Sequence, residues 1–232
     1  MDMLLGKKLQ MTQIWDDDGN IKPVTVIQVG PCPVIQVKAK DGKDGYDAVQ
    51  IGFHELPARN AGKGDPRVNK PMLGHFKKSG VTPQRHLREV RLGEGQKAPE
   101  VGTVLKVDQV FQSGTQVDVV GTSIGRGFQG CVRRHGFGGG RKSHGSKSHR
   151  EPGSISSNQT PSRILRGKRM PGQMGNQRAT VRNLDVIKVE ADQNLLYVMG
   201  PVPGPSNGLV LVRKAVSPRK RGTTKAAGKK GK

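Results

Sequence analysis

The sequence predicts a mainly β fold, with strands arranged in an antiparallel barrel or sandwich around one modest core. Three observations support this class. Short apolar runs alternate with polar residues and are separated by Gly, Pro, Asn and Asp turns. The 33 glycines and 15 prolines among 232 residues indicate many turns. The apolar residues are concentrated in residues 1–56, 101–121 and 180–212, which suffices for one core.

The first predicted strands follow one another closely along the chain. Residues 22–29 predict a strand, and Gly30 to Pro33 predict a turn. Residues 34–38 predict the next strand, and residues 46–53 predict a third with alternating burial. Short strands joined by tight turns are typical of antiparallel sheets.

Residues 54–98 break this pattern and are expected to form a small α/β insertion packed beside the barrel. Residues 71–78 predict a short helix, with Pro71 in its first turn and Gly80 just after its end. Residues 85–92 are mixed and alternate only weakly.

Strand character returns on both sides of a gap of about sixty residues that has no strand period. The predicted strands are residues 102–111, 116–121, 179–181, 184–189, 195–199 and 209–212. We expect them to belong to one sheet system, from which residues 121–179 leave and return as a hairpin. Each arm of about 30 residues could reach at most roughly 100 Å.

These patterns divide the chain into six consecutive parts. They are the first barrel strands (1–53), the α/β insertion (54–98), further barrel strands (99–120), an extended basic Gly-rich loop (121–179), the last barrel strands (180–212) and a basic C-terminal tail (213–232).

Nearly all of the net charge of +22 lies in the loop and the tail. Residues 121–180 carry twelve Lys or Arg and one acidic residue, Glu151, and residues 213–232 carry nine Lys or Arg and no acidic residue. Such segments repel themselves and gain little by folding alone. A dense polyanion stabilises them, and the phosphate backbone of a nucleic acid is the usual partner. An RNA-contacting tail is therefore favoured over a solvated tail or a nuclear signal.

A membrane partner is not expected. No apolar run approaches the roughly 18 residues that span a bilayer, and the basic segment lacks the apolar face of an interfacial helix. The first residues, Met1 to Lys8, lack the apolar core of a signal peptide. Cys32 and Cys131 are expected to be free thiols in a reducing compartment.

Enzyme, cofactor and metal sites are not expected either. Gly125 to Gly130 matches G-x-G-x-x-G, but no amphipathic helix follows, so a dinucleotide site is not expected. The potential zinc ligands lie among cations at a spacing that fits no standard finger; they are Cys131, His135, His144 and His149. The loop has one carboxylate, so an acid–base pair is missing. We expect no catalytic residue, no metal, no cofactor and no small-molecule substrate.

Two aromatic residues, Phe128 and Phe137, are interleaved with the cations of the loop. Aromatic side chains can stack on unpaired bases while neighbouring cations hold phosphates. The two rings could equally pack on each other as a small knot, and both arrangements can coexist.

Several stretches of the chain resemble one known family. They are residues 5–14, 23–27, 68–71, 74–78, 121–123, 127–130, 134–137, 143–146, 150–155 and 167–176. Taken together they resemble the large-subunit ribosomal protein L-three family in its bacterial form, over about residues 3 to 216. The chain departs from the family pattern at Gln10, where Gly is frequent, and at Ile124, where Lys is frequent.

The resemblance implies a six-stranded translation-factor-like β-barrel with a small α/β insertion and a basic loop directed toward the peptidyl-transferase centre. It implies a structural, non-enzymatic constituent of the large ribosomal subunit in the cytoplasm. Such a protein binds large-subunit rRNA directly near its 3′ end, nucleates subunit assembly and contacts neighbouring ribosomal proteins. Gln159 matches a glutamine that some bacterial members carry methylated, which would make a glutamine methyltransferase a further partner.

Charge and resemblance together give a set of candidate rRNA-binding residues, with Phe128 and Phe137 as candidate stacking residues. The set is Lys7, Lys8, Lys70, His75, Lys77, Lys78, Arg126, Arg133, Arg134, His135, Arg141, Lys142, His144, Lys147, His149, Arg150, Arg163, Arg166, Lys168, Arg169 and Arg178. Two alternative functions stay open from sequence alone. One is a free-standing nucleic-acid chaperone or transcription regulator, and the other is a nucleotide-dependent enzyme using the Gly-rich segment.

Overall fold

The computed structural model describes residues 1–16, 19–42, 44–56, 68–93, 95–156 and 159–219. The chain divides into two compact units, which we name the core unit (Met1–Gly121 with Ala179–Lys232) and the loop unit (Thr122–Arg178). The loop unit lies within the predicted basic loop, residues 121–179. Most of the predicted tail, from residue 220 onward, lies outside the described residues.

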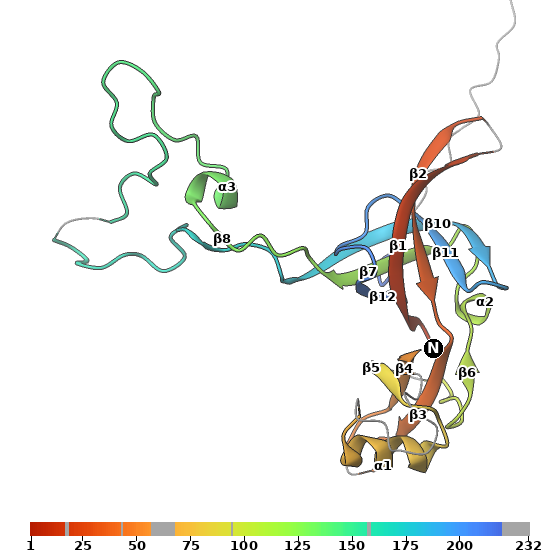
Figure 1. The fold of residues 1–232 in the computed structure, drawn as a ribbon. Coiled ribbons are helices and arrows are strands. Elements are labelled where there is room, and N and C mark those ends of the chain that lie inside the picture. Colours follow the sequence, from red (N-terminus) through yellow and green to blue (C-terminus); the bar gives the residue numbers. More distant parts are fainter. Residues whose placement is uncertain (17–18, 43, 57–67, 94, 157–158, 220–232) are drawn as a thin grey trace, which may run out of the picture. The chain divides into compact units, whose positions relative to one another are not determined.

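Six antiparallel strands form the larger sheet of the core unit and close it into a barrel (Figure 1). In spatial order they are β1 (Met3–Trp15), β12 (Leu209–Lys214), β7 (Gln116–Thr122), β10 (Arg178–Glu190), β11 (Leu195–Met199) and β2 (Ile21–Val29). The mainly β class predicted from sequence is confirmed.

Alternating apolar residues explain the pairing of these strands. Leu4 lies opposite Val212 and Gly6 opposite Val210 across the β1–β12 pair. A Cβ atom at Gly6 would lie 2.7 Å from the backbone oxygen of Gln28, so a side chain there would push β1 and β2 apart. Leu4 and Val212 are fully buried, and burying such a side chain contributes about 1.5–3 kcal/mol.

A second, four-stranded antiparallel sheet completes the core unit. Its order is β5 (Gln84–Arg91), β4 (Ala48–Glu55), β3 (Cys32–Lys38) and β6 (Val104–Leu105). Helix α1 (Lys70–Ser79) belongs to the same part of the chain (Figure 1). It buries Phe76. The helix predicted at residues 71–78 is confirmed, with Pro71 in the first turn and Gly80 left-handed at φ 68° after its end.

Three strand assignments made from sequence are wrong. Residues 34–38 and 46–53 were expected in the barrel, but they correspond to β3 and β4 of the second sheet. The strand expected at residues 102–111 is the two-residue β6 followed by a short helix, α2 (Val107–Val110). The Gln109 side chain accepts a hydrogen bond from the backbone N–H of Lys106 at 3.2 Å, which caps this helix.

The loop unit contains very little regular structure. Strands β8 (Phe128–Gln129) and β9 (Gly172–Gln173) pair with each other, and helix α3 (Cys131–His135) follows β8. Cys131 is the one buried side chain among the described residues of this unit. In the described ranges as a whole, no helix is long and apolar enough to cross a membrane.

Candidate nucleic-acid interface

The two arms of the loop unit are joined at their base by backbone hydrogen bonds. The N–H of Ser123 donates to the carbonyl of Gln177 at 2.9 Å, and the N–H of Arg126 donates to that of Met174 at 2.8 Å. Gly175 has φ 73°, and a Cβ atom there would lie 2.1 Å from the backbone oxygen of Ile124. Glycine therefore permits the close approach of the two arms at this point.

Helix α3 is held against the returning arm by two of the predicted RNA-binding cations. Arg134 Nη1 donates to the Met170 carbonyl at 2.6 Å, and His135 Nε2 lies 2.9 Å from the same oxygen. The carbonyl can only accept, so Nε2 carries the hydrogen. A Cβ atom at Gly172 would lie 2.6 Å from Arg134 Nη1, which explains the glycine there. Arg134 and His135 therefore position the backbone of the loop unit.

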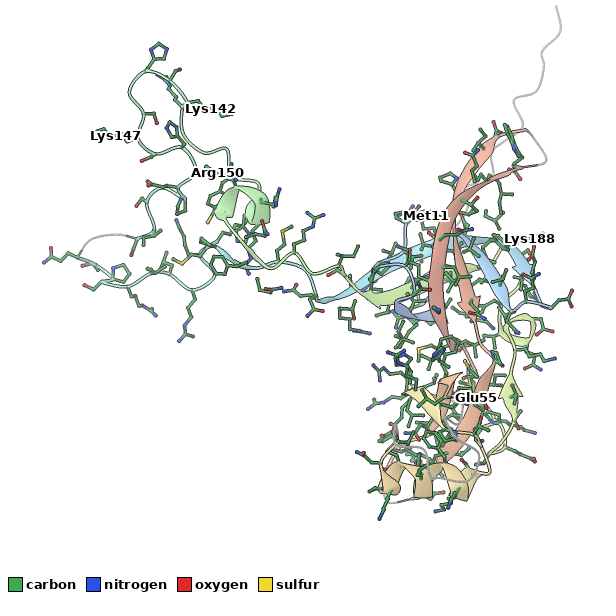
Figure 2. The ribbon with its side chains drawn as sticks, viewed as in Figure 1. Met11, Glu55, Lys142, Lys147, Arg150 and Lys188 are labelled. Atoms are coloured by element: carbon green, nitrogen blue, oxygen red, sulfur yellow. The ribbon has the colours of Figure 1, made fainter. Side chains whose placement is uncertain are left out.

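Beyond α3 the chain folds back on itself at two adjacent glycines, Gly139 and Gly140. The N–H of Gly140 donates to the carbonyl of His149 at 3.1 Å, and a Cβ atom at Gly140 would lie 2.0 Å from the Ser148 oxygen. His149 Nδ1 lies 2.9 Å from the Arg141 carbonyl. The residues between carry exposed cations, and Figure 2 shows Lys142 and Lys147 on this turn.

Most candidate cations of the loop unit are exposed. They are Arg126, Arg133, Arg141, Lys142, His144, Lys147, His149, Arg150, Arg163, Arg166, Lys168, Arg169 and Arg178. None of the Lys and Arg side chains described in this unit forms an ion pair, because all six ion pairs found between described residues lie in the core unit. The surface of the loop unit thus carries uncompensated positive charge.

The two aromatic residues of the loop unit differ in exposure. The Phe128 side chain is 75% exposed. Phe137 is half-buried, and its ring lies 6.0 Å from the His135 ring, centroid to centroid. Phe128 is therefore free to stack on a base, whereas Phe137 supports the end of α3.

The candidate cations of the core unit fall into two groups. Lys8 Nζ donates to the carbonyls of Val202 and Gly204 at 2.8 and 2.9 Å, and His75 Nε2 lies 2.6 Å from Gln50 Oε1. These two side chains are engaged within the protein. The other group is more available, since Lys7 is half-buried and three lysines are exposed: Lys70, Lys77 and Lys78.

Sequence reasoning missed a further set of basic residues on β5. This strand lies at the edge of the second sheet and carries exposed Arg85, Arg88 and Arg91 with half-buried His86. Arg91 lies over the Tyr46 ring, 5.0 Å from its centroid. Three arginines in one eight-residue strand could have indicated an exposed edge strand, because charged side chains are frequent on the edge strands of sheets.

The cysteines and the remaining candidate sites can be placed briefly. Both thiols are free, as predicted, and the structure buries both. Burial raises the pKa of Cys32 to about 12. Within the described ranges no three His, Cys, Asp or Glu side chains gather as a metal site would require. Gln159 is exposed, and its backbone carbonyl accepts a hydrogen bond from Ser162 Oγ at 2.6 Å.

Comparison with known proteins gives consistent matches. A family described as Ribosomal protein L3 matches residues 84–194. The large ribosomal subunit protein uL3 of Geobacter sulfurreducens is 50% identical over 216 residues, covering 93% of this chain and 98% of the relative. The uL3 proteins of Pelotomaculum thermopropionicum and Thermotoga petrophila are 51% and 49% identical, covering 93% and 95% of this chain and 98% and 100% of those relatives. The proteins of this family are structural, not enzymes. With half of its residues identical to these relatives across nearly its whole length, the chain belongs to the ribosomal protein L3 family.

Proposed function

We propose that this chain is a structural constituent of the large ribosomal subunit in the cytoplasm, and that it binds large-subunit rRNA directly. The observation that carries the proposal is the composition of the loop unit. Among its described residues, none of the Lys and Arg side chains forms an ion pair and only one side chain is buried. Such a unit has little to gain from its own burial, so an external polyanion is needed to stabilise it.

The geometry supports a division of labour among the candidate residues. The exposed Lys and Arg side chains neutralise phosphates, and each contact releases condensed counterions. Arg134 and His135 keep α3 against the returning arm, so that these cations are presented in one arrangement. Exposed Phe128 supplies a ring for base stacking.

The finer points of the proposal rest on the family resemblance. They are binding near the 3′ end of the rRNA, nucleation of subunit assembly, contact with neighbouring ribosomal proteins, and direction of the loop unit toward the peptidyl-transferase centre. The likeness of the closed six-stranded sheet to translation-factor barrels belongs to the same proposal. So does the division of the chain, except that β3, β4 and β6 belong to the second sheet and not to the barrel. Methylation of the exposed Gln159 by a glutamine methyltransferase is its last part, and a 14-dalton excess in the intact native mass checks it.

Sedimentation of a native lysate through sucrose gradients tests the proposal. We expect the chain to migrate with the large subunit in low salt and to stay there in high salt, because a component buried within folded rRNA is released only when that structure opens. Recovery at the top of the gradient, or release at moderate salt, would contradict a buried structural role. That result would favour a free-standing nucleic-acid chaperone.

A further inference from the structure

A small cavity in the core unit is lined by basic side chains. It has a volume of about 190 Å³, and its ionisable lining residues are Lys7 of β1, His54 of β4, and Arg85 and His86 of β5. No carboxylate of a described residue lines it. Neither His54 nor the two β5 residues were among the candidates found from sequence.

The basic groups of this cavity lack partners in the part of the chain that the structure describes. No hydrogen bond or ion pair to a described residue engages the side chains of Lys7, His54, Arg85 or His86. Lys38 elsewhere in the core unit shows the contrast, since its ammonium lies 2.8 Å from Glu89 Oε1. Converging cations without a counter-charge repel one another, so an anion bound among them would be stabilising.

The pKa of His86 is consistent with an excess of positive charge around the cavity. Burial, followed by the cations Arg85 and Arg88 and by His54, lowers the pKa of His86 below its ordinary value of 6.5. An anion placed in the cavity would act in the opposite direction, because a nearby negative charge favours the protonated ring.

The backbone at His54 points to a role for its side chain. His54 has φ 66°, in the left-handed region that residues other than glycine rarely adopt. It lies between two paired positions, Phe53 opposite His86 and Glu55 opposite Gln84. Left-handed residues other than glycine cost free energy and tend to persist at functional sites.

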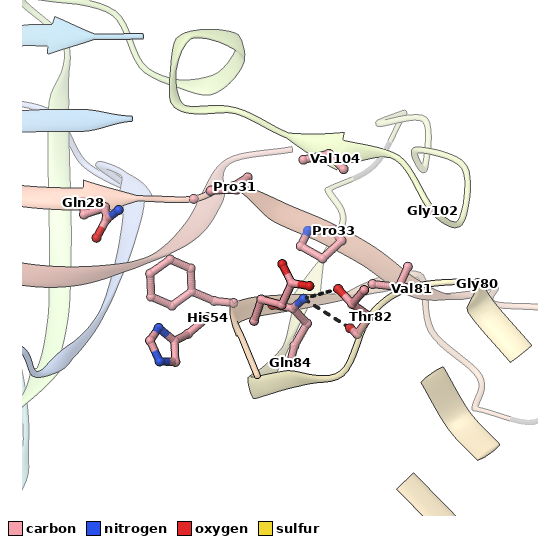
Figure 3. Close-up of a pocket in the computed structure, with 13 residues that line it drawn as sticks. Gln28, Pro31, Pro33, His54, Gly80, Val81, Thr82, Gln84, Gly102 and Val104 are labelled. Carbon is pink, nitrogen blue, oxygen red and sulfur yellow. Dashed lines mark hydrogen bonds between the residues drawn. The ribbon is translucent and has the colours of Figure 1, made fainter. Parts of the chain in front are cut away.

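A larger cavity nearby differs from the small one in the charge of its lining residues. It has a volume of about 510 Å³ (Figure 3). It shares Phe53 and His54 with the smaller cavity. It also contains the Glu55 carboxylate, and Gln84 Nε2 inside it already donates to Thr82 at 3.2 and 3.3 Å. This cavity has one possible cation and one acid, so it lacks the charge excess of the smaller one.

We propose that the 190 Å³ cavity binds one backbone phosphate of the rRNA, an inference that rests on the proposed function. The Arg85 guanidinium can hold two phosphate oxygens at once, and the Lys7 ammonium adds a point charge. The imidazoles of His54 and His86 supply further donors. A single phosphate held this way fixes the register of the core unit on the RNA, since phosphate contacts position a protein without reading sequence.

The test compares two arginines of the same strand in the full-length chain. Arg85 lines the cavity, whereas Arg88 lies outside it and donates to its own neighbour, the Leu87 carbonyl, at 2.8 Å. Affinity for large-subunit rRNA is measured for wild type, R85Q, R88Q and K7Q over a range of salt concentrations. We expect R85Q and K7Q to bind about tenfold more weakly, with a salt slope reduced by roughly 0.7–0.9, while R88Q, which removes an exposed charge outside the cavity, should weaken binding clearly less.

Equal behaviour of R85Q and R88Q, with wild type still binding rRNA, would overturn the cavity assignment and leave the proposed function standing. Failure of wild type itself to bind rRNA would overturn both. Thermal unfolding of each variant verifies that it is folded before its affinity is compared.

A second measurement identifies the source of the phosphate. NMR titration gives the pKa of His86 in the free chain, with an rRNA fragment bound, and with inorganic phosphate at an equal concentration of phosphate groups. We expect the rRNA fragment to raise this pKa and inorganic phosphate to raise it far less. If inorganic phosphate alone gave the full rise, and R85Q bound rRNA as R88Q does, the cavity would be a site for free anions instead.

Discussion

The core unit and the loop unit differ in what stabilises them. The core unit contains the whole hydrophobic cluster and all six ion pairs seen between described residues. The described part of the loop unit buries only Cys131 and is shaped by backbone hydrogen bonds and closely packed glycines. One chain thus combines a segment stabilised by its own apolar burial with a segment that buries almost no side chain, and we propose that the second is stabilised largely by bound rRNA.

Magnitudes make the difference concrete. Ordering a residue costs about 1–2 kcal/mol of backbone entropy, and a buried Leu or Val side chain returns about 1.5–3 kcal/mol. The core unit has buried side chains on every barrel strand, including Leu5, Ile27, Val119, Val186, Leu196 and Val210. The described part of the loop unit has almost none, and under the proposed function its order depends on the rRNA that neutralises it.

Removal of the loop unit should have the largest effect, because it should abolish most rRNA binding and leave the stability of the core unit unchanged. The N–H of Ser123 donates to Gln177, so the ends of the unit lie close together and a short Gly-Ser linker can join Gly121 to Ala179. We expect the shortened chain to unfold cooperatively at nearly the wild-type temperature, because the core is intact. Its rRNA affinity should fall by orders of magnitude and its salt slope should become much smaller. Calorimetry and salt-dependent rRNA binding measure the two effects, and unfolding of the shortened chain would refute the separation of roles.

Truncating a core side chain should have the reverse effect. Leu5 is fully buried, so L5A should lower the free energy of unfolding by about 2–5 kcal/mol. The matched change in the loop unit is I124A, where the side chain is 59% exposed and the expected loss is below about 0.5 kcal/mol. Urea unfolding of both variants gives the values, and a similar loss from both would contradict the account.

Two neighbouring arginines of α3 sharpen the comparison within the loop unit. Arg134 donates to the Met170 carbonyl, whereas Arg133 is exposed and lies 3.3 Å from the Gln129 side-chain oxygen. R134Q and R133Q remove the same charge, but only R134Q releases α3 from the returning arm. We expect R134Q to bind rRNA about fivefold to tenfold more weakly than R133Q, with the unfolding temperature of both unchanged. Indistinguishable affinities would show that Arg134 acts by charge alone.

The smallest expected effect is a dependence of core stability on pH. The folded-state pKa of His86 lies below its ordinary value of 6.5, so the unfolded chain binds this proton more readily. Stability should therefore decline as pH falls through about 6.5 toward the folded pKa, by less than about 1 kcal/mol because solvent screens the ring. H86Q should remove this part of the slope in urea unfolding between pH 7.5 and 5.5. An unchanged slope would mean that His86 does not sense its cationic neighbours.

The sequence predicted those elements whose signals are local. Strand β2, helix α1 and strand β12 were located within one or two residues, since alternation and Pro/Gly boundaries mark them. Strand β1 was missed, and its burial does not alternate, since its buried residues 4–6 are consecutive and residues 10–13 are all exposed. The apolar spacing of Val104, Leu105, Val107 and Val110 fits a strand as well as a short helix. Which sheet β3 and β4 join depends on partners distant in sequence, and alternation carries no information about them.

The candidate site was predictable to a similar extent. Charge density located the loop unit, because like charges without acids are visible in the sequence alone. The hydrogen bonds that Lys8 and Arg134 donate within the protein were not predictable. Both go to backbone carbonyls, which every residue has, so the sequence carries no mark of them. The cavity of Lys7, His54 and Arg85 was missed because three separate strands bring these residues together.

Hydrogen exchange tests the central claim most directly. Exchange is followed by mass spectrometry for the free chain and for the chain in intact large subunits, under the same buffer. The account predicts that amides of the barrel strands are protected in both states, whereas amides of Thr122–Arg178 exchange rapidly in the free chain and become protected in the subunit. Strong protection of Thr122–Arg178 in the free chain would contradict the claim that this unit depends on RNA for its order.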